Sequence, residues 1–345
     1  KKKMRSASSS SSSSCVFLSI ALVLCALVLG GHSAMELDHQ TSHVATVFPV
    51  SQPIITYWNE DDGGNPVECG VAFPDFEQFW TLDYTAAGQS TERFVFNYPT
   101  ELPFVHLQVD WNPLGHPGGM SESTTLEFLT WTPDQQLAFL QANGSFFGVP
   151  HFDVHFHMKS VAYVENITCS GGFPPCAWTP EEQERFMDPG PLSYYPKTYF
   201  LDPTAAVPAM GSHHERNVDK ERDVFMADGE FIYGSYDGEI LFWEPMISMA
   251  QFQAVRALAI SDPSGEASQT FSIALPEDYI VDGYYPRAYT VSYYEDEAYF
   301  TVALDRLVSR RASGPLAPST ANGLQLNALF VLFVSGCSLA ISLIL

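Results

Sequence analysis

Residues 151–157 read His-Phe-Asp-Val-His-Phe-His, a stretch that alternates ionisable and apolar side chains. Because successive side chains of a β-strand point to opposite faces, the stretch predicts a strand with one polar and one apolar face. The polar face would carry His151, Asp153, His155 and His157. Ionisable groups on a buried strand are costly unless a metal ion or a hydrogen-bond network satisfies them. We therefore expect a metal-binding or hydrogen-bonded face opposite a core face.

Short segments rich in aromatic and β-branched residues recur along the chain, and most end near Gly, Pro, Asp or Asn. They are residues 44–48, 94–96, 104–109, 151–158, 161–164, 231–233, 240–243, 271–274, 289–294 and 298–302. Residues 236–238, Tyr-Asp-Gly, predict a tight hairpin. The pattern indicates a mainly β (α+β) protein, with a β-sandwich or barrel-like sheet core, a few short helices and long loops.

Three segments have the start signals of helices. Residues 132–144 begin with Thr-Pro-Asp and end at Asn-Gly, so a capping threonine precedes a proline at the first helical position. Thr179 and Glu182 fit a capping box. A third helix is predicted to begin at Glu244 and to run through Arg256.

Both ends of the chain resemble processing signals. Residues 1–34 combine basic residues, an apolar run and small residues, the order of a secretory signal peptide cleaved near Ala34; a retained anchor helix is the alternative. Residues 313–345 end in an uncharged apolar tail, which predicts a GPI-attachment signal with Ala312 or Ser313 as the acceptor. A single C-terminal span is the rival, although no basic residue follows it. We expect one extracellular domain over residues 35–312, held at the outer face of the plasma membrane.

The predicted mature chain is strongly acidic. Four of the 16 Lys and Arg lie in the first five residues, so 12 remain against 40 Asp and Glu, a net charge near −28. Without a basic footprint, electrostatic binding of nucleic acid is excluded. The high aromatic content also argues against a disordered acidic tail.

Cysteines and sequons agree with secretion. Cys169 and Cys176 flank a turn-rich loop that a short disulfide could close, which leaves Cys69 either free or paired with one of them. Asn143 and Asn166 begin sequons, so both are expected glycosylation sites.

Six segments in order resemble an uncharacterised secreted family, the TTHB-like domains of bacteria and some eukaryotes. They are residues 64–71 (GNPVECGV), 109–116 (VDWNPLGH), 150–156 (PHFDVHF), 210–213 (MGSH), 233–238 (YGSYDG) and 242–246 (FWEPM). The resemblance would cover roughly residues 44–306 and implies a shared fold and site, but no reaction. The chain departs from that pattern at His157 and His214, where aromatic residues are common.

The histidines of the central strand are the candidate metal ligands. His155 and His157 could present two imidazoles to one ion. His151 lies roughly 13 Å from His155 in an extended strand, so all three cannot easily ligate one metal. The set would be His155 with His151 or His157, completed by His116, His213 or Glu244 from other segments. Asp153 would fix an imidazole tautomer.

Two functions follow from this site. The first is a cell-surface domain with a histidine-lined pocket for one divalent metal, with zinc preferred. If the site is enzymatic, it would carry out metal-assisted hydrolysis or hydration, with Glu244 or Asp153 handling the proton. The second is a non-catalytic surface binding or structural protein whose histidines form a buried polar network. No nucleophile elbow, Walker loop, dinucleotide fingerprint or HExxH motif is present.

Overall fold

The computed structural model describes residues 35, 37–45, 52–75, 90–95, 98–113, 115, 147–168, 179–216 and 222–313. Several sequence predictions lie outside these residues. They are the signal peptide, the helix at 132–144, His116, Asn143, Cys169, Cys176 and the apolar C-terminal tail.

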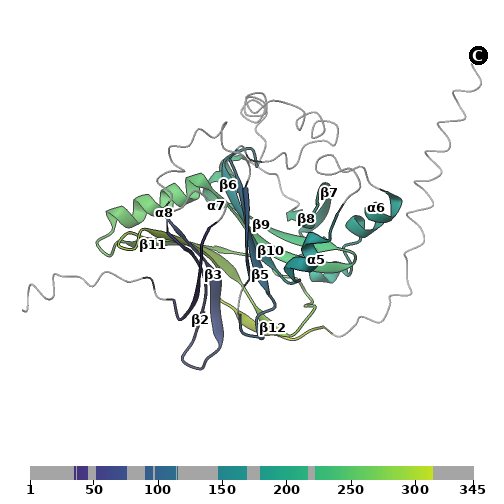
Figure 1. The fold of residues 1–345 in the computed structure, drawn as a ribbon, viewed down its shortest axis with the longest axis horizontal. Helices are drawn as coiled ribbons and strands as arrows, with labels where there is room; N and C mark the ends of the chain where they lie inside the picture. Colours follow the sequence, from purple (N-terminus) through teal and green to yellow (C-terminus); the bar gives the residue numbers. More distant parts are fainter. Residues whose placement is uncertain are drawn as a thin grey trace, which may run out of the picture.

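Two large antiparallel sheets form the fold (Figure 1). The seven-stranded sheet runs in the order β4 (Ser90–Val95), β5 (His106–Asn112), β6 (His151–His157), β10 (Glu239–Ser248), β9 (Glu230–Tyr236), β8 (Gly211–Arg216) and β7 (Tyr199–Val207). The six-stranded sheet runs in the order β1 (His39–His43), β2 (Ile54–Glu60), β3 (Pro66–Pro74), β14 (Tyr299–Asp305), β13 (Ala288–Tyr294) and β11 (Glu266–Ser272). A small ribbon pairs β12 (Gly283–Tyr285) with β15 (Val308–Arg310).

The main core lies between the two large sheets. Phe152 on β6 packs against Phe73 on β3, with ring centroids 5.9 Å apart, and Phe231 on β9 packs against Tyr289 on β13 at the same distance. Each such buried side chain contributes roughly 1.5–3 kcal/mol relative to an exposed one. The expected β-rich α+β fold with a sandwich-like core is confirmed.

The hairpin between β9 and β10 turns at Asp237 and Gly238, where it was predicted. Their φ angles are 55° and 77°, as in a type I′ turn, which needs positive φ at both central positions of a two-residue hairpin. The Gly238 N–H also donates to the carbonyl of Asp188 at 3.1 Å, which ties the turn to a neighbouring loop.

The helix predicted to begin at Glu244 is wrong at its start. Glu244 and Pro245 belong to β10, and α8 (Met249–Ser261) begins after Ser248. Ser248 and Gln251 form the true capping box: the Ser248 Oγ accepts from the Gln251 N–H at 3.2 Å, and the Gln251 side chain accepts from the Ser248 N–H at 2.9 Å.

The strand predicted at residues 161–164 is also wrong, because these residues form α5 (Val161–Glu165). The Ser160 side chain accepts a bond from the Tyr163 N–H, which caps the helix and outweighs the strand preference of the two valines.

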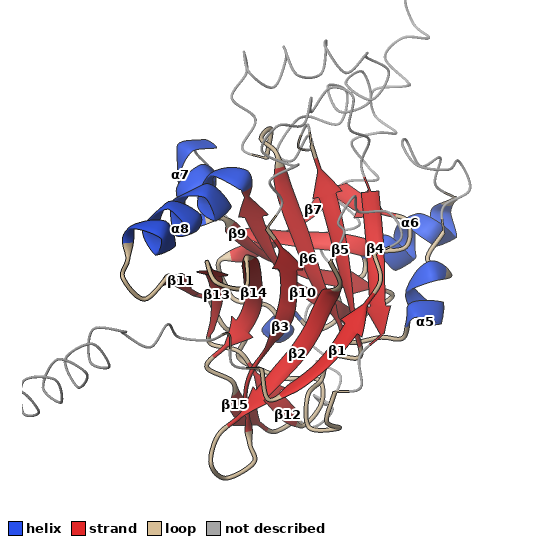
Figure 2. Cartoon of the chain, turned by 60° about the vertical axis from the view of Figure 1, so that its left-hand side comes forward, coloured by secondary structure: helices blue, strands red, loops and turns tan. Residues whose placement is uncertain are grey.

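The remaining helices lie at the margins of the sheets. The capping box of Thr179 and Glu182 is confirmed at the start of α6 (Pro180–Met187). A short 3-10 turn, η1, spans Leu192–Tyr194, and α7 (Arg222–Asp228) contacts α8. Figure 2 shows α7 and α8 on one side of the sheets and α5 and α6 on the other. None of the described helices is long and apolar enough to cross a membrane.

Cys69 lies fully buried in β3 and is free among the described residues. Burial raises the pKa of its thiol well above the ordinary range, so the thiol stays protonated and packs as a small apolar group.

Candidate functional site

The site lies on the face of the seven-stranded sheet that points away from the six-stranded sheet. The side chains of β6 alternate between two faces, as predicted. Phe152, Val154 and Phe156 point into the main core. On the other face, Gln108 of β5 is opposite His155, and Asp110 is opposite Asp153. Polar side chains of neighbouring strands therefore meet on one buried surface.

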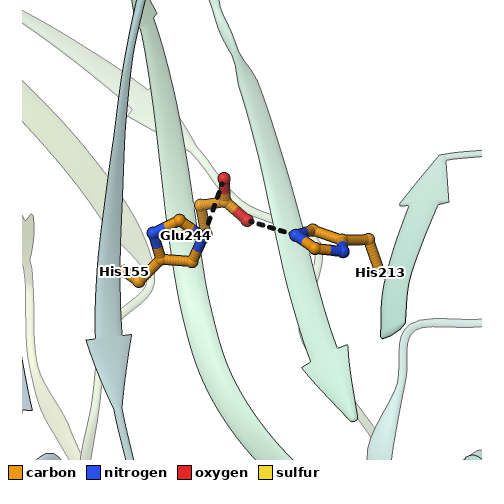
Figure 3. Close-up of side chains that lie close together, drawn as sticks. All are labelled: His155, His213 and Glu244. Atoms are coloured by element: carbon orange, nitrogen blue, oxygen red, sulfur yellow. Dashed lines mark ion pairs between the residues drawn. The ribbon is translucent and has the colours of Figure 1, made fainter. Parts of the chain in front are cut away.

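His155, His213 and Glu244 converge on this surface from β6, β8 and β10 (Figure 3). Glu244 Oε1 is 3.4 Å from His155 Nε2, and Glu244 Oε2 is 3.9 Å from His213 Nε2. One donor atom from each residue lies within 4.8 Å of the others. His155 and Glu244 are each 1% exposed and His213 is 9% exposed. We call these three residues the triad.

Asp110 supports the triad from behind. Its Oδ2 lies 3.2 Å from His155 Nδ1 and also accepts a bond from Gln108 Nε2 at 2.8 Å. The Thr91 hydroxyl donates to the other oxygen of Asp110, and Arg93 Nε donates to Gln108 Oε1 at 2.8 Å. Residues from β4 and β5 thus hold the carboxylate in place.

The protonation of the triad depends on burial and on nearby carboxylates. Burial lowers the pKa of His155, but Glu244, Asp110 and Asp153 outweigh this effect and raise it above its ordinary value. Burial raises the pKa of Glu244, opposed by His155 and reinforced by Asp153, Asp110 and Glu215. The charged form of His155 is therefore favoured by the surrounding carboxylates.

His157 lies beside the triad but does not join it. Its ring stacks on His106 at 4.2 Å between centroids and lies 5.7 Å from the ring of His155. Both ring nitrogens are buried and make no hydrogen bond with any described residue. Burial, followed by the charges of His106 and His155, lowers the pKa of His157 well below its ordinary value. His157 is therefore a neutral, packed imidazole.

His151 and Asp153 form a separate polar pair. His151 Nε2 is 3.2 Å from Asp153 Oδ1, and His151 Nδ1 donates to the Val149 carbonyl at 2.7 Å. Asn112 Nδ2 donates to Asp153 Oδ2 at 2.7 Å. The structure therefore places Asp110, rather than Asp153, against the imidazole of His155.

Sequence reasoning missed Asp110 and Gln108. The signal was present, because polar residues recur at every second position from His106 to Asn112, as they do from His151 to His157. Two such strands side by side would have placed a carboxylate opposite the histidines.

No model of a protein family, no curated protein and no solved structure matches this chain. The resemblance to the TTHB-like domains stays a prediction. Function is therefore inferred from the geometry of the triad and of the groups around it.

Proposed function

We propose that the chain binds one divalent cation between His155, His213 and Glu244. Two imidazoles and a carboxylate are the protein ligands of many mononuclear zinc sites and of non-haem iron sites. Zinc is our first choice, because imidazole and carboxylate donors suit it and it accepts low coordination numbers. The observation that carries the proposal is the convergence of three donors from separate strands within 4.8 Å.

The charge of the surroundings supports a dication. Asp110, Asp153 and Glu215 are each less than 7% exposed, and all three act electrostatically on Glu244. Buried carboxylates are costly unless cations or hydrogen bonds compensate them. One proton on His155 offsets only part of this charge, whereas a divalent cation offsets more.

The tautomer of His155 also supports the proposal. When a metal displaces one proton of His155, the carboxylate of Asp110 beside Nδ1 would keep the other proton on that nitrogen, so the Nε2 lone pair would be available as a ligand. A carboxylate behind a ligating histidine is the usual second layer of a zinc site.

Three protein ligands would leave one coordination position for water or substrate, as in catalytic zinc sites. A zinc ion lowers the pKa of bound water to about 7, which would serve hydrolysis or hydration. With Glu244 as a ligand, Asp153 is the remaining candidate for proton transfer. The rival function is a non-catalytic surface protein whose histidines form a polar network.

The proposed location is the secretory pathway and the outer cell surface, through a lipid anchor at Ala312 or Ser313. The support is the sequence pattern, together with the exposure of Ala312 just after β15.

The test is the metal content of residues 35–312, secreted from eukaryotic cells without a histidine tag and measured by mass spectrometry. We expect stoichiometric zinc or another divalent metal, lost in His155→Ala and in Glu244→Gln. His214→Phe is the matched control, because His214 is buried on the same strand as His213 but stacks on Tyr195, 3.8 Å away, instead of joining the triad. Folded protein that binds no metal would contradict the proposal and favour the polar network.

A further inference from the structure

Gly234 lies in β9, between the strands that carry the triad. It is opposite His213 of β8 on one side and opposite Phe242 of β10 on the other. A Cβ atom at Gly234 would lie 2.1 Å from Cε1 and 2.2 Å from Cζ of Phe242. The phenyl ring of Phe242 therefore fills the space where any other residue would carry its side chain.

Phe242 uses that space to contact three imidazoles. Its ring centroid lies 4.7 Å from that of His155, 5.2 Å from that of His213 and 5.4 Å from that of His157. The three contacts are edge-to-face, with interplanar angles of 80°, 61° and 69°. Phe242 is fully buried, so the ring has little freedom to move elsewhere.

The contact with Phe242 matters because few hydrogen bonds hold these imidazoles in place. Both ring nitrogens of His157 have no hydrogen-bond partner among the described residues, and those of His155 face Asp110 and Glu244 at 3.2 and 3.4 Å without a well-aligned hydrogen bond. The orientation of these rings therefore depends strongly on packing, and both rings pack against the phenyl ring of Phe242.

From this arrangement we infer that Gly234 and Phe242 are positioning residues of the triad. The inference rests on the proposed function: the missing side chain at Gly234 seats Phe242, and Phe242 aims the imidazoles of His155 and His213 at one point. A methyl group at position 234 would drive the phenyl ring toward the imidazoles or out of contact with them. Either movement would misalign the donor atoms, because a packed interior transmits such displacements.

The experiment compares four proteins: the wild type, Gly234→Ala, the double variant Gly234→Ala/Phe242→Leu, and Gly70→Ala. Gly70 is a matched control, since it is a buried strand glycine of β3 in the other sheet, where a Cβ would lie 2.6 Å from the Val302 carbonyl oxygen. Co²⁺ affinity and the Co²⁺ absorption spectrum report the ligand geometry. The proton resonances of the histidine rings report ring positions in the metal-free protein. Thermal unfolding reports stability.

We expect Gly234→Ala to weaken Co²⁺ binding about 10- to 100-fold and to alter the spectrum, the range found when the support of a metal ligand is removed. The ring resonances of His155 and His213 should also shift. The smaller leucine of the double variant should relieve the clash and recover stability, but both readouts should stay altered, because the phenyl ring that contacts His155 and His213 is gone. Gly70→Ala should lower the unfolding temperature and leave both readouts unchanged.

Two results would overturn the inference. One is a Gly234→Ala protein whose ring resonances and Co²⁺ spectrum match the wild type. The other is a double variant whose ring resonances and Co²⁺ spectrum both match the wild type, because the imidazoles would then be aimed without the ring of Phe242. Failure of the wild type to bind Co²⁺ would instead contradict the metal site itself, and the ring resonances of metal-free protein would still decide whether Gly234 and Phe242 position the histidines.

Discussion

The carboxylate of Asp110 lies behind the imidazole of His155, with Oδ2 3.2 Å from Nδ1, while Glu244 lies 3.4 Å from Nε2 on the other side of the ring. The ring is therefore held between two buried carboxylates. Only the one at Nε2 belongs to the triad, so the two carboxylates are expected to have different effects on metal binding.

Replacement of Asp110 by Asn should show how much Asp110 adds to metal affinity through its contact with His155, although it is not itself a ligand. The amide keeps the shape but loses the charge that favours a proton on Nδ1, so metal affinity should fall about 10- to 100-fold without complete loss. Competition with a chelator of known affinity measures this. Asp153→Asn is the control, because Asp153 lies near the triad but pairs with His151. An equal loss in both variants would show that general negative charge, rather than contact with His155, matters.

Phe152 should dominate the stability of the sandwich. Its ring lies 4.7 Å from that of Trp111, 5.8 Å from that of Phe252 and 5.9 Å from that of Phe73, so it joins both sheets and α8. Phe152→Ala should lower the free energy of unfolding by about 3–5 kcal/mol, measured by urea denaturation. Phe200 is 43% exposed, and its replacement by Ala should cost far less. Equal costs would mean that the two sheets do not share this core.

The strands of the site could be predicted because their alternation is a local property of the chain. Residues 151–157 share one face in any extended conformation, and a Tyr-Asp-Gly turn favours a hairpin wherever it occurs. The capping box of Thr179 and Glu182 is equally local. The same local reasoning was wrong at Glu244, because a Glu-Pro pair is typical of a helix start, whereas Pro245 here lies inside β10, between residues Trp243 and Met246 that pair with β6.

The composition of the triad could not be predicted, since it depends on strand order. His155 and Glu244 meet because β10 pairs with β6, and His213 reaches them across β9. Pairing between strands far apart in the sequence leaves no periodic signal in either strand. The effect of a glycine at position 234 can likewise be recognised only when β8, β9 and β10 are known to be neighbours, because Phe242 of β10 fills the space beside it.

Glu68 should make stability depend on pH. Burial raises the pKa of this carboxyl, the Tyr57 hydroxyl bound at 2.6 Å opposes the rise, and Asp305 directly opposite on β14 adds to it. Folded Glu68 therefore keeps its proton at a higher pH than the unfolded chain does. The free energy of unfolding should fall as pH rises from 4.5, the ordinary pKa of the carboxyl, through the raised folded value.

Glu68→Gln tests this dependence by denaturation at several pH values. The glutamine amide oxygen can still accept the hydrogen bond from the Tyr57 hydroxyl. The substitution also removes the repulsion between the negative charges of Glu68 and Asp305, so the variant should be about 0.5–1 kcal/mol more stable than the wild type at neutral pH. The gain should vanish in acid. Asp61 is the contrasting control, since bonds from Asn65 lower its pKa, and Asp61→Asn should reduce stability at neutral pH. A Glu68→Gln gain that is the same at every pH would contradict the titration.

Asn166 should carry an N-linked glycan when the chain passes through the secretory pathway of a eukaryotic cell. The residue is exposed after α5, where its Nδ2 donates to the Ala162 carbonyl at 2.7 Å. Glycosylation during synthesis would precede that bond and would place the sugar in solvent. Deglycosylation should therefore reduce the mass of the secreted protein, and Asn166→Gln should remove the part due to this site. Thr168→Ala is the sharper variant, because it destroys the sequon while the Asn166 cap remains. Peptide mass spectra with an unmodified Asn166 in the wild type would contradict glycosylation at this position.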